Sequence, residues 1–107
     1  MKFILLLSLI FVPQLAFSNS CKVKNQGSYT LCAEYTAPQN YIDGFKENCI
    51  TQQNGTWSGE NQCLEASHGC KIDTDQGLSV KIWYIDVESL EAIEFACRTM
   101  GAEIIQQ

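Results

Sequence analysis

The 107-residue sequence contains few of the residues on which many enzymes and nucleic-acid-binding proteins depend. It has one histidine, and its seven lysines and arginines are scattered rather than clustered. Because clustered cations that neutralise phosphates dominate affinity for nucleic acids, the sequence predicts no nucleic-acid partner. A Gly-rich phosphate loop, a His/Cys zinc spacing and a flavin motif are all missing, so we expect no metal site and no cofactor.

Long hydrophobic runs are also missing after the first residues. The segments FILLLSLIFV and PQLAFSNS, which follow Lys2, have the charged, apolar and small-residue order of a secretory signal peptide. The apolar run is shorter than the roughly 20 residues that cross a bilayer, so stable membrane insertion is not expected. The small residues Ala16 and Ser18 predict cleavage after residue 18.

Two products of this leader are compared. Plain secretion leaves one compact domain, 19–107, in the periplasm, at the cell surface or outside the cell. Lipidation of Cys21 is the alternative, but the segment Ser18–Asn19–Ser20 lacks the aliphatic residue that usually precedes a lipidated cysteine. We therefore expect a secreted, soluble form.

The predicted mature domain is acidic. Loss of residues 1–18 removes Lys2 and leaves 6 Lys and Arg against 12 Asp and Glu, a formal charge of −6. Such a charge favours solubility and attracts cationic partners, so the expected partner is an unknown protein or cell-surface ligand of cationic character.

The six cysteines all lie in the predicted mature domain. An even number of cysteines in a small exported chain predicts a disulfide framework. Fifteen pairings of six cysteines exist, and spacing alone does not choose among them. The positions are Cys21, Cys32, Cys49, Cys63, Cys70 and Cys97.

An internal repeat supplies the missing constraint. An offset of 49 residues places Cys21 on Cys70 and Tyr35 on Tyr84, and an offset of 48 places Cys49 on Cys97. Two related modules, at about 21–64 and 70–106, follow from this alignment. If each module closes independently, the pairs are Cys21–Cys49 and Cys70–Cys97, and Cys32–Cys63 remains.

Periodicity predicts the elements of each module. Apolar residues alternate in 28–36 and 78–86, which indicates half-buried strands; residues 70–73 form the strand of a hairpin whose turn contains Gly77. A helix over 87–100 is expected from an Asp86 N-cap, a staple between Ile85 and Leu90, and a closing Gly101. A weaker helix over 41–51, capped by Asn40, and strands at 55–59 and 102–106 complete the pattern.

The resulting fold class is α+β: two β-β-α-β modules with an antiparallel sheet, two helices and disulfide staples. Alternation places Cys32 on the outer face of its strand, away from the helices. We therefore expect Cys32–Cys63 to be the more exposed bridge and the first to be reduced.

Several short motifs resemble a group of small exported or surface-attached bacterial proteins with duplicated cysteine-containing modules. The resemblance extends over about 21–101 and implies no catalytic residue. It depends on Cys21, Cys32 followed by AEY, Cys49 with GTW, Cys63, Gly69–Cys70, Trp83–Tyr84, and Cys97 followed by RTMG.

Candidates for chemistry are few. The single histidine, His68, follows Ser67, and Glu65 is one of many acids that could orient it. Asn54–Gly55–Thr56 is a glycosylation acceptor only if the source is eukaryotic. We expect a protein that is not an enzyme, and keep a small secreted hydrolase as an alternative.

Trp83 and Ile85 are the candidate binding residues. They alternate with the inward residues of their strand and stand where the first module has Glu34 and Thr36. Either they pack beneath another segment or they form an exposed interaction patch, since aromatics are enriched at binding hot spots. The predicted function is a secreted binding domain of unknown ligand, with an inhibitor of a cationic secreted hydrolase as a further alternative.

Overall fold

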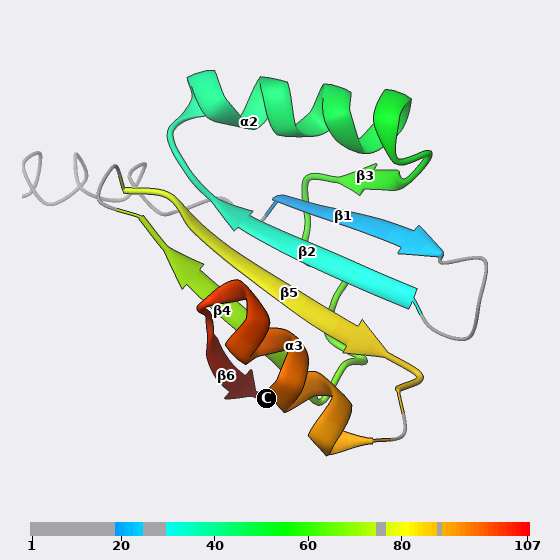
Figure 1. Cartoon of the computed structure of the whole chain (residues 1–107). Helices are drawn as coiled ribbons and strands as arrows, with labels where there is room; N and C mark the ends of the chain where they lie inside the picture. Colours follow the sequence, from blue (N-terminus) through cyan, green and yellow to red (C-terminus); the bar gives the residue numbers. More distant parts are fainter. Residues whose placement is uncertain (1–18, 25–29, 75–76, 88) are drawn as a thin grey trace, which may run out of the picture.

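The computed structural model of the chain describes residues 19–24, 30–74, 77–87 and 89–107. The predicted signal peptide and part of the predicted hairpin turn lie outside these residues. The described chain is α+β, with one antiparallel sheet of six strands, two helices and three disulfides, which confirms the predicted fold class at this level. Figure 1 shows α2 near strands β3 and β1 and α3 near strands β4 and β6.

The strands occur in the sheet in the order β3-β1-β2-β5-β4-β6, with β2 and β5 at its centre. Each interior strand pairs antiparallel with both neighbours, so its backbone groups are satisfied within the sheet. The strands are β1 (Asn19–Lys24), β2 (Thr30–Thr36), β3 (Thr56–Ser58), β4 (His68–Asp73), β5 (Ser79–Ile85) and β6 (Glu103–Gln106).

The first helix, α2 (Gln39–Glu47), begins earlier than predicted. Pro38 is its N-cap, so Asn40 lies inside the first turn instead of capping it. The helix continues into a π-helical turn, η2 (Asn48–Gln52), which carries Cys49. Ile42 is the only buried residue of α2, so the helix covers little of the sheet.

The second helix, α3 (Leu90–Met100), begins later than predicted. Ser89 is its N-cap, and the Ser89 side chain accepts a hydrogen bond from the Ala92 amide. Asp86 instead has a φ of 66°, which is not the extended backbone of an N-cap. Leu90 is exposed and Ile85 is buried, so the predicted staple is wrong. Gly101, with a φ of 70°, ends the helix as expected.

The three disulfides join Cys21 to Cys49, Cys32 to Cys63 and Cys70 to Cys97, the same pairs that the repeat predicts. All six cysteines are bonded. Cys32 and Cys63 are both fully buried, so the expectation that this bridge is the exposed one is wrong. A segment of chain covers it.

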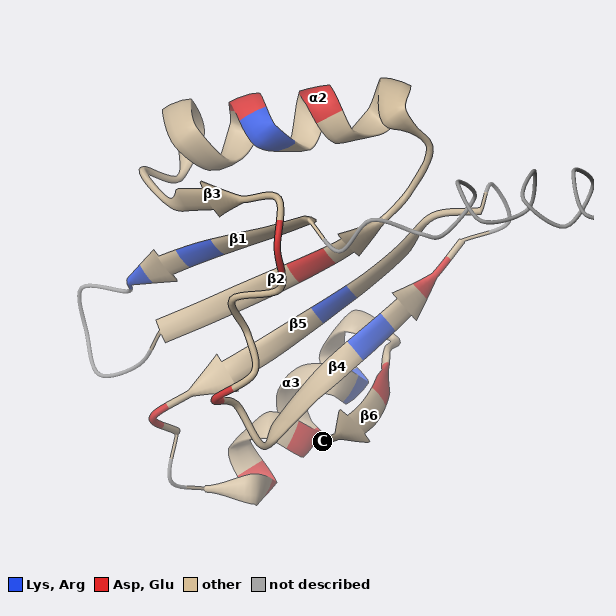
Figure 2. Cartoon of the chain, turned by 180° about the vertical axis from the view of Figure 1, so that it is seen from behind, with Lys and Arg blue, Asp and Glu red and all other residues tan. Residues whose placement is uncertain are grey.

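That segment is residues 59–67, called the strap below, which crosses the face of the sheet away from the helices between β3 and β4 (Figure 2). The buried Ser20 hydroxyl on β1 donates to the Glu60 backbone carbonyl at 2.7 Å and accepts from the Gln62 backbone N–H at 3.2 Å. At the other end, the Gln107 side chain donates to the carbonyls of Cys63 and Ala66. The strap is therefore attached to the sheet at both ends.

Candidate functional site

One row of side chains explains where the helices sit. Cys21, Ala33, Ile82 and Cys70 lie directly opposite one another across strands β1, β2, β5 and β4. Residues opposite each other in an antiparallel sheet share a face. The two end cysteines bond to η2 and α3, so both helices lie on this face. Ala33 and Ile82, in the middle of the row, lie between them.

The uncovered middle of this face forms a hollow, called the central groove below. Its volume is about 500 Å³, within the range of roughly 300–1,000 Å³ usual for ligand sites. Most of its lining side chains are aliphatic, and those of the central strands are only partly buried. The lining residues are Cys21, Val23, Lys24, Leu31, Ala33, Tyr35, Gln53, Val80 and Ile82.

A second hollow, of about 490 Å³, adjoins α2 and shares Tyr35 with the central groove. The Tyr35 ring stacks on Phe45, with centroids 4.5 Å apart, and on Trp57 at 5.8 Å. Partial burial by these neighbours raises the pKa of the Tyr35 hydroxyl. The α2 and η2 residues that line this hollow are uncharged: Asn40, Tyr41, Gly44, Phe45 and Asn48.

The opposite end of the central groove is polar. Gln53 follows the π-helical turn η2 there, and Lys24 ends β1, in a row with Thr30 and Ile85 that faces the strap. Two hydrogen bonds to Asn48 position Gln53. The Gln53 side chain donates to the Asn48 side-chain oxygen at 3.0 Å, and the Gln53 backbone N–H donates to the Asn48 carbonyl. The Lys24 ammonium has no ion-pair partner within the described ranges.

The floor of the central groove presents side chains and no free backbone groups. Strand β2 pairs with β1 and β5, and β5 pairs with β2 and β4, so both central strands are paired along both edges. An extended peptide placed here would find no backbone partners for its own amides, and burial of unpaired amides is costly. The floor therefore suits a ligand that needs apolar contact alone.

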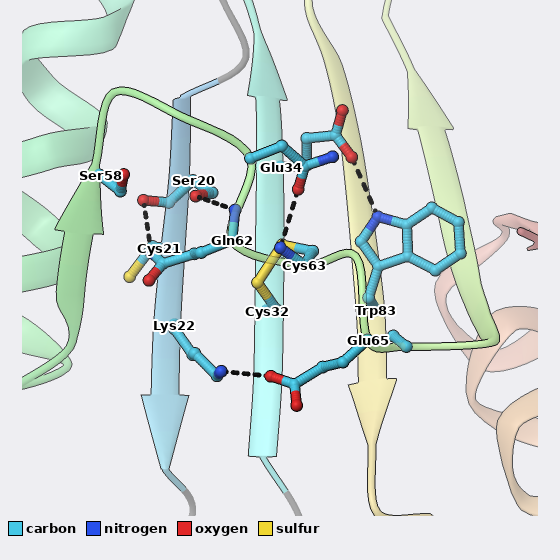
Figure 3. Close-up of a disulfide and its surroundings, with 12 residues drawn as sticks. Ser20, Cys21, Lys22, Cys32, Glu34, Ser58, Gln62, Cys63, Glu65 and Trp83 are labelled. Carbon is cyan, nitrogen blue, oxygen red and sulfur yellow. Dashed lines mark hydrogen bonds and ion pairs between the residues drawn. A yellow bond between two sulfur atoms is a disulfide. The ribbon is translucent and has the colours of Figure 1, made fainter.

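Trp83 lies on the opposite face, beneath the strap (Figure 3), and Ile85 belongs to the same buried cluster. Trp83 is 3% exposed and Ile85 7% exposed, and both pack with the Cys32–Cys63 disulfide and Ala66. The Trp83 indole N–H donates to the Glu34 carboxylate at 3.1 Å. They pack in a core, which is the first of the two alternatives given for them, and they form no exposed interaction patch.

The residues weighed for catalysis do not assemble. Glu65, on the strap, pairs its carboxylate with the Lys22 ammonium, so it is not placed to orient His68 (Figure 3). No hydrogen bond joins Ser67 to His68 in the part of the chain that the structure describes. Among the same residues no group of three or more His, Cys, Asp or Glu side chains is arranged to hold a metal ion.

The alternation in 28–36 and 78–86 correctly predicts the inner face of the two central strands, but that face was expected to be covered by the helices. The overlooked signal is the small apolar content of the helix over 41–51, whose stripe contains only Ile42, Phe45 and Cys49. Such a stripe is too narrow to cover three strands.

In the described ranges no helix is long and apolar enough to cross a membrane. Comparison with protein families, curated proteins and solved structures found no match.

Proposed function

We propose that the chain is an exported, non-enzymatic binding domain whose ligand occupies the central groove. The observation that carries this proposal is the difference between the two faces of the central strands. On one face, Trp83 and the Cys32–Cys63 disulfide lie beneath the strap. On the other, the aliphatic side chains of Leu31, Ala33, Val80 and Ile82 line an open hollow. An apolar surface left open between two covalently attached helices is typical of a ligand site.

Export is part of the proposal. Disulfides form and persist in oxidising compartments, and all six cysteines are in disulfides. The predicted signal peptide at 1–18 and the resemblance to small exported bacterial proteins support the same location. Since no thiol is free, the chain has no cysteine nucleophile, and the positions of Glu65 and His68 give a hydrolase less support than a binding role.

Duplication of a β-β-α-β module accounts for the groove. The sheet order reads β3-β1-β2 in one half and β6-β4-β5 from the other edge, so equivalent strands occupy equivalent places. The central β2–β5 pair then joins the two modules. On this proposal each module brings one helical segment bonded to its middle strand, β1 or β4, and the groove lies between the two modules.

The alternative of an inhibitor of a cationic secreted hydrolase has separate support. Asp43 and Glu47 on α2 and Glu91 and Glu94 on α3 are exposed acids. Charge complementarity of this kind accelerates association with a cationic protein. An inhibitor that acts through these acids would lose potency in salt and would be indifferent to changes in the central groove.

The experiment uses the neutral dye N-phenyl-1-naphthylamine, whose fluorescence rises in an apolar site. We expect the oxidised protein to bind the dye, and Ala33→Phe, which fills the groove, to weaken binding. Ala92→Phe makes the same change at an exposed position of α3 that does not line the groove, and should have no effect. Methyl NMR provides a second readout that needs no variant. Shifts at Val80 and Ile82 support the proposal, and shifts confined to Ile85 and Ile105, or no binding, reject it.

A further inference from the structure

One flank of helix α2 carries no charge. The charged residues of the helix are Asp43, Lys46 and Glu47 (Figure 2). At about 100° per residue these three fall on one side of the helix, whereas Ile42 and Cys49 are buried against the sheet. The remaining flank supplies the helical lining of the second hollow, called the α2 hollow below: Asn40, Tyr41, Gly44, Phe45 and Asn48. Helical spacing and the lining of the hollow therefore agree on which side chains face it.

Tyr35 forms the sheet side of the α2 hollow. It lies two residues after Ala33 on β2 and opposite Val80, so it is on the face that the helices occupy. Its ring stacks on Phe45 from the helix, with centroids 4.5 Å apart. The two walls of the hollow thus meet at this aromatic pair, which holds them together.

Gly44 lies in the middle of the uncharged flank, and neither the backbone nor the packing of α2 requires a glycine there. A glycine inside a helix costs about 1 kcal/mol relative to alanine. Glycine is needed where φ is positive or where another group approaches the backbone closely. Gly44 has a helical φ, and an added Cβ would meet nothing within 4 Å. A larger side chain would instead project into the α2 hollow, so the open space is what this glycine preserves.

The polar groups of the α2 hollow suit hydroxyl groups better than ions. Amide side chains both donate and accept hydrogen bonds, as hydroxyl groups do. The Asn48 oxygen accepts from Gln53, but among the described residues its N–H groups and the Asn40 side chain make no hydrogen bond. The Tyr41 side chain beside them is 38% exposed. An ion placed here would lose water without gaining a partner of opposite charge, which is unfavourable.

We propose that the α2 hollow binds a neutral saccharide of gluco configuration. The hydroxyl groups of such a ring are equatorial, so its two faces present only C–H groups. One face packs on the Tyr41 ring, whose electron-rich surface attracts C–H groups, and the hydroxyl rim pairs with the amides of Asn40 and Asn48. This site adjoins the central groove at Tyr35, but it does not require the groove to bind a ligand.

The test titrates trisaccharides into the oxidised, ¹⁵N-labelled domain at physiological salt. Two probes are neutral, cellotriose and triacetylchitotriose. The third, deacetylated chitotriose, has the same ring and linkage as the second but carries ammonium groups at mildly acidic pH. Because the net charge of the domain attracts the cationic probe, tighter binding of its neutral counterpart is diagnostic of an uncharged site. We expect that order, with NMR shifts at the Gly44 backbone and the Asn40 and Asn48 side-chain amides.

Paired variants locate the site on α2. Gly44→Leu fills the hollow and should abolish detectable binding, while its higher helix propensity favours the folded state. Lys46→Leu places the same side chain on the charged flank and should leave binding unchanged. Asn40→Ala should weaken binding about two- to tenfold, the range of one hydrogen bond. Gln39→Ala removes an amide that bonds to Asp43 on the charged flank, and should have no effect.

Several results would overturn the saccharide site. These are absence of binding by both neutral probes, preference for the cationic probe, and equal weakening by Gly44→Leu and Lys46→Leu. Shifts confined to Val80 and Ile82 would also overturn it, because they would place the sugar in the central groove. Gly44→Leu should still bind N-phenyl-1-naphthylamine, since Gly44 does not line that groove. Loss of both ligands in this variant would mean that the two hollows are one site.

Discussion

Gly69 and Gly44 receive the same methyl group on substitution by alanine, and the structure predicts opposite effects on stability. At Gly69, on β4, an added Cβ would lie 2.4 Å from the Ile82 carbonyl oxygen and 2.9 Å from the Trp83 ring. The obstacle is the backbone of a neighbouring strand, so a side-chain rotation does not remove the clash. At Gly44, on α2, an added Cβ meets nothing within 4 Å.

The magnitudes follow from these surroundings. Overpacking a filled interior costs about 1–3 kcal/mol, and Gly69→Ala belongs at the upper end because β4 must move away from β5. Gly44→Ala removes backbone freedom from the unfolded chain at a helical position and stabilises by about 0.4–1 kcal/mol. For a domain of this size, each kcal/mol corresponds to about 4–8 °C in Tm. The two variants should therefore differ by well over 10 °C.

The assay is urea unfolding followed by circular dichroism, with the disulfides intact. The midpoint and the slope of the free energy of unfolding against urea concentration are both measured. A lower midpoint with an unchanged slope means lost stability, whereas a changed slope means a change in the unfolded state. Equal midpoints for Gly69→Ala and the unsubstituted protein would refute the register that places Gly69 against Trp83. Destabilisation by Gly44→Ala would show that α2 is packed more closely than the structure indicates.

Four further substitutions test other parts of the fold. Trp83→Ser should cost about 3–5 kcal/mol or abolish folding, because the ring is in the core beneath the strap. Near-native stability of this variant would contradict burial of the ring and favour an exposed interaction patch. Ser89→Ala should cost about 1 kcal/mol through loss of the α3 N-cap. Asp86→Gly should be neutral or stabilising, because φ is positive at Asp86. If thermal melting shows that Asp86→Gly is the more destabilising of the two, Asp86 is the N-cap instead. Burial raises the pKa of Tyr35 above its ordinary value of about 10. The folded state therefore keeps the hydroxyl proton at a pH at which the unfolded state has lost it, so stability falls as the pH rises from about 10 towards the pKa of the folded state. Tyr35→Phe should reduce this alkaline loss between about pH 9 and 11, and an unchanged slope would place the hydroxyl in solvent.

The strands and the disulfide pairs could be predicted because both follow from short-range patterns. Alternation at Tyr29, Leu31, Ala33 and Tyr35 identifies a strand and its inner face without knowledge of its partners. The predicted repeat, with each module assumed to close on itself, then reduces fifteen pairings to one. Neither inference depends on what covers the sheet, which is why both agree with the structure.

The ends of the helices and the exposure of single residues depend on packing that the sequence does not display. Asp86 is as good an N-cap by residue type as Ser89, and only the backbone at Asp86 excludes it. Cys32 lies on the outer face as predicted, yet the strap buries it. Pattern reasoning had no means to place a nine-residue irregular segment over Trp83, because irregular segments have no periodicity.

The location of the central groove has one physical cause, the placement of the two helix disulfides at the ends of a single row. Cys21 and Cys70 lie on β1 and β4, with two strands between them, so their separation is about 14 Å at roughly 4.8 Å per strand. Packed helices approach to about 8–10 Å, so helices bonded at these two points do not close over Ala33 and Ile82. Each disulfide holds one point of its helical segment close to its own strand, with Cα–Cα distances of 6.0 and 5.3 Å, and so limits inward movement. The groove is therefore kept open by covalent bonds in the free protein, and a ligand that enters it does not first have to separate the helices.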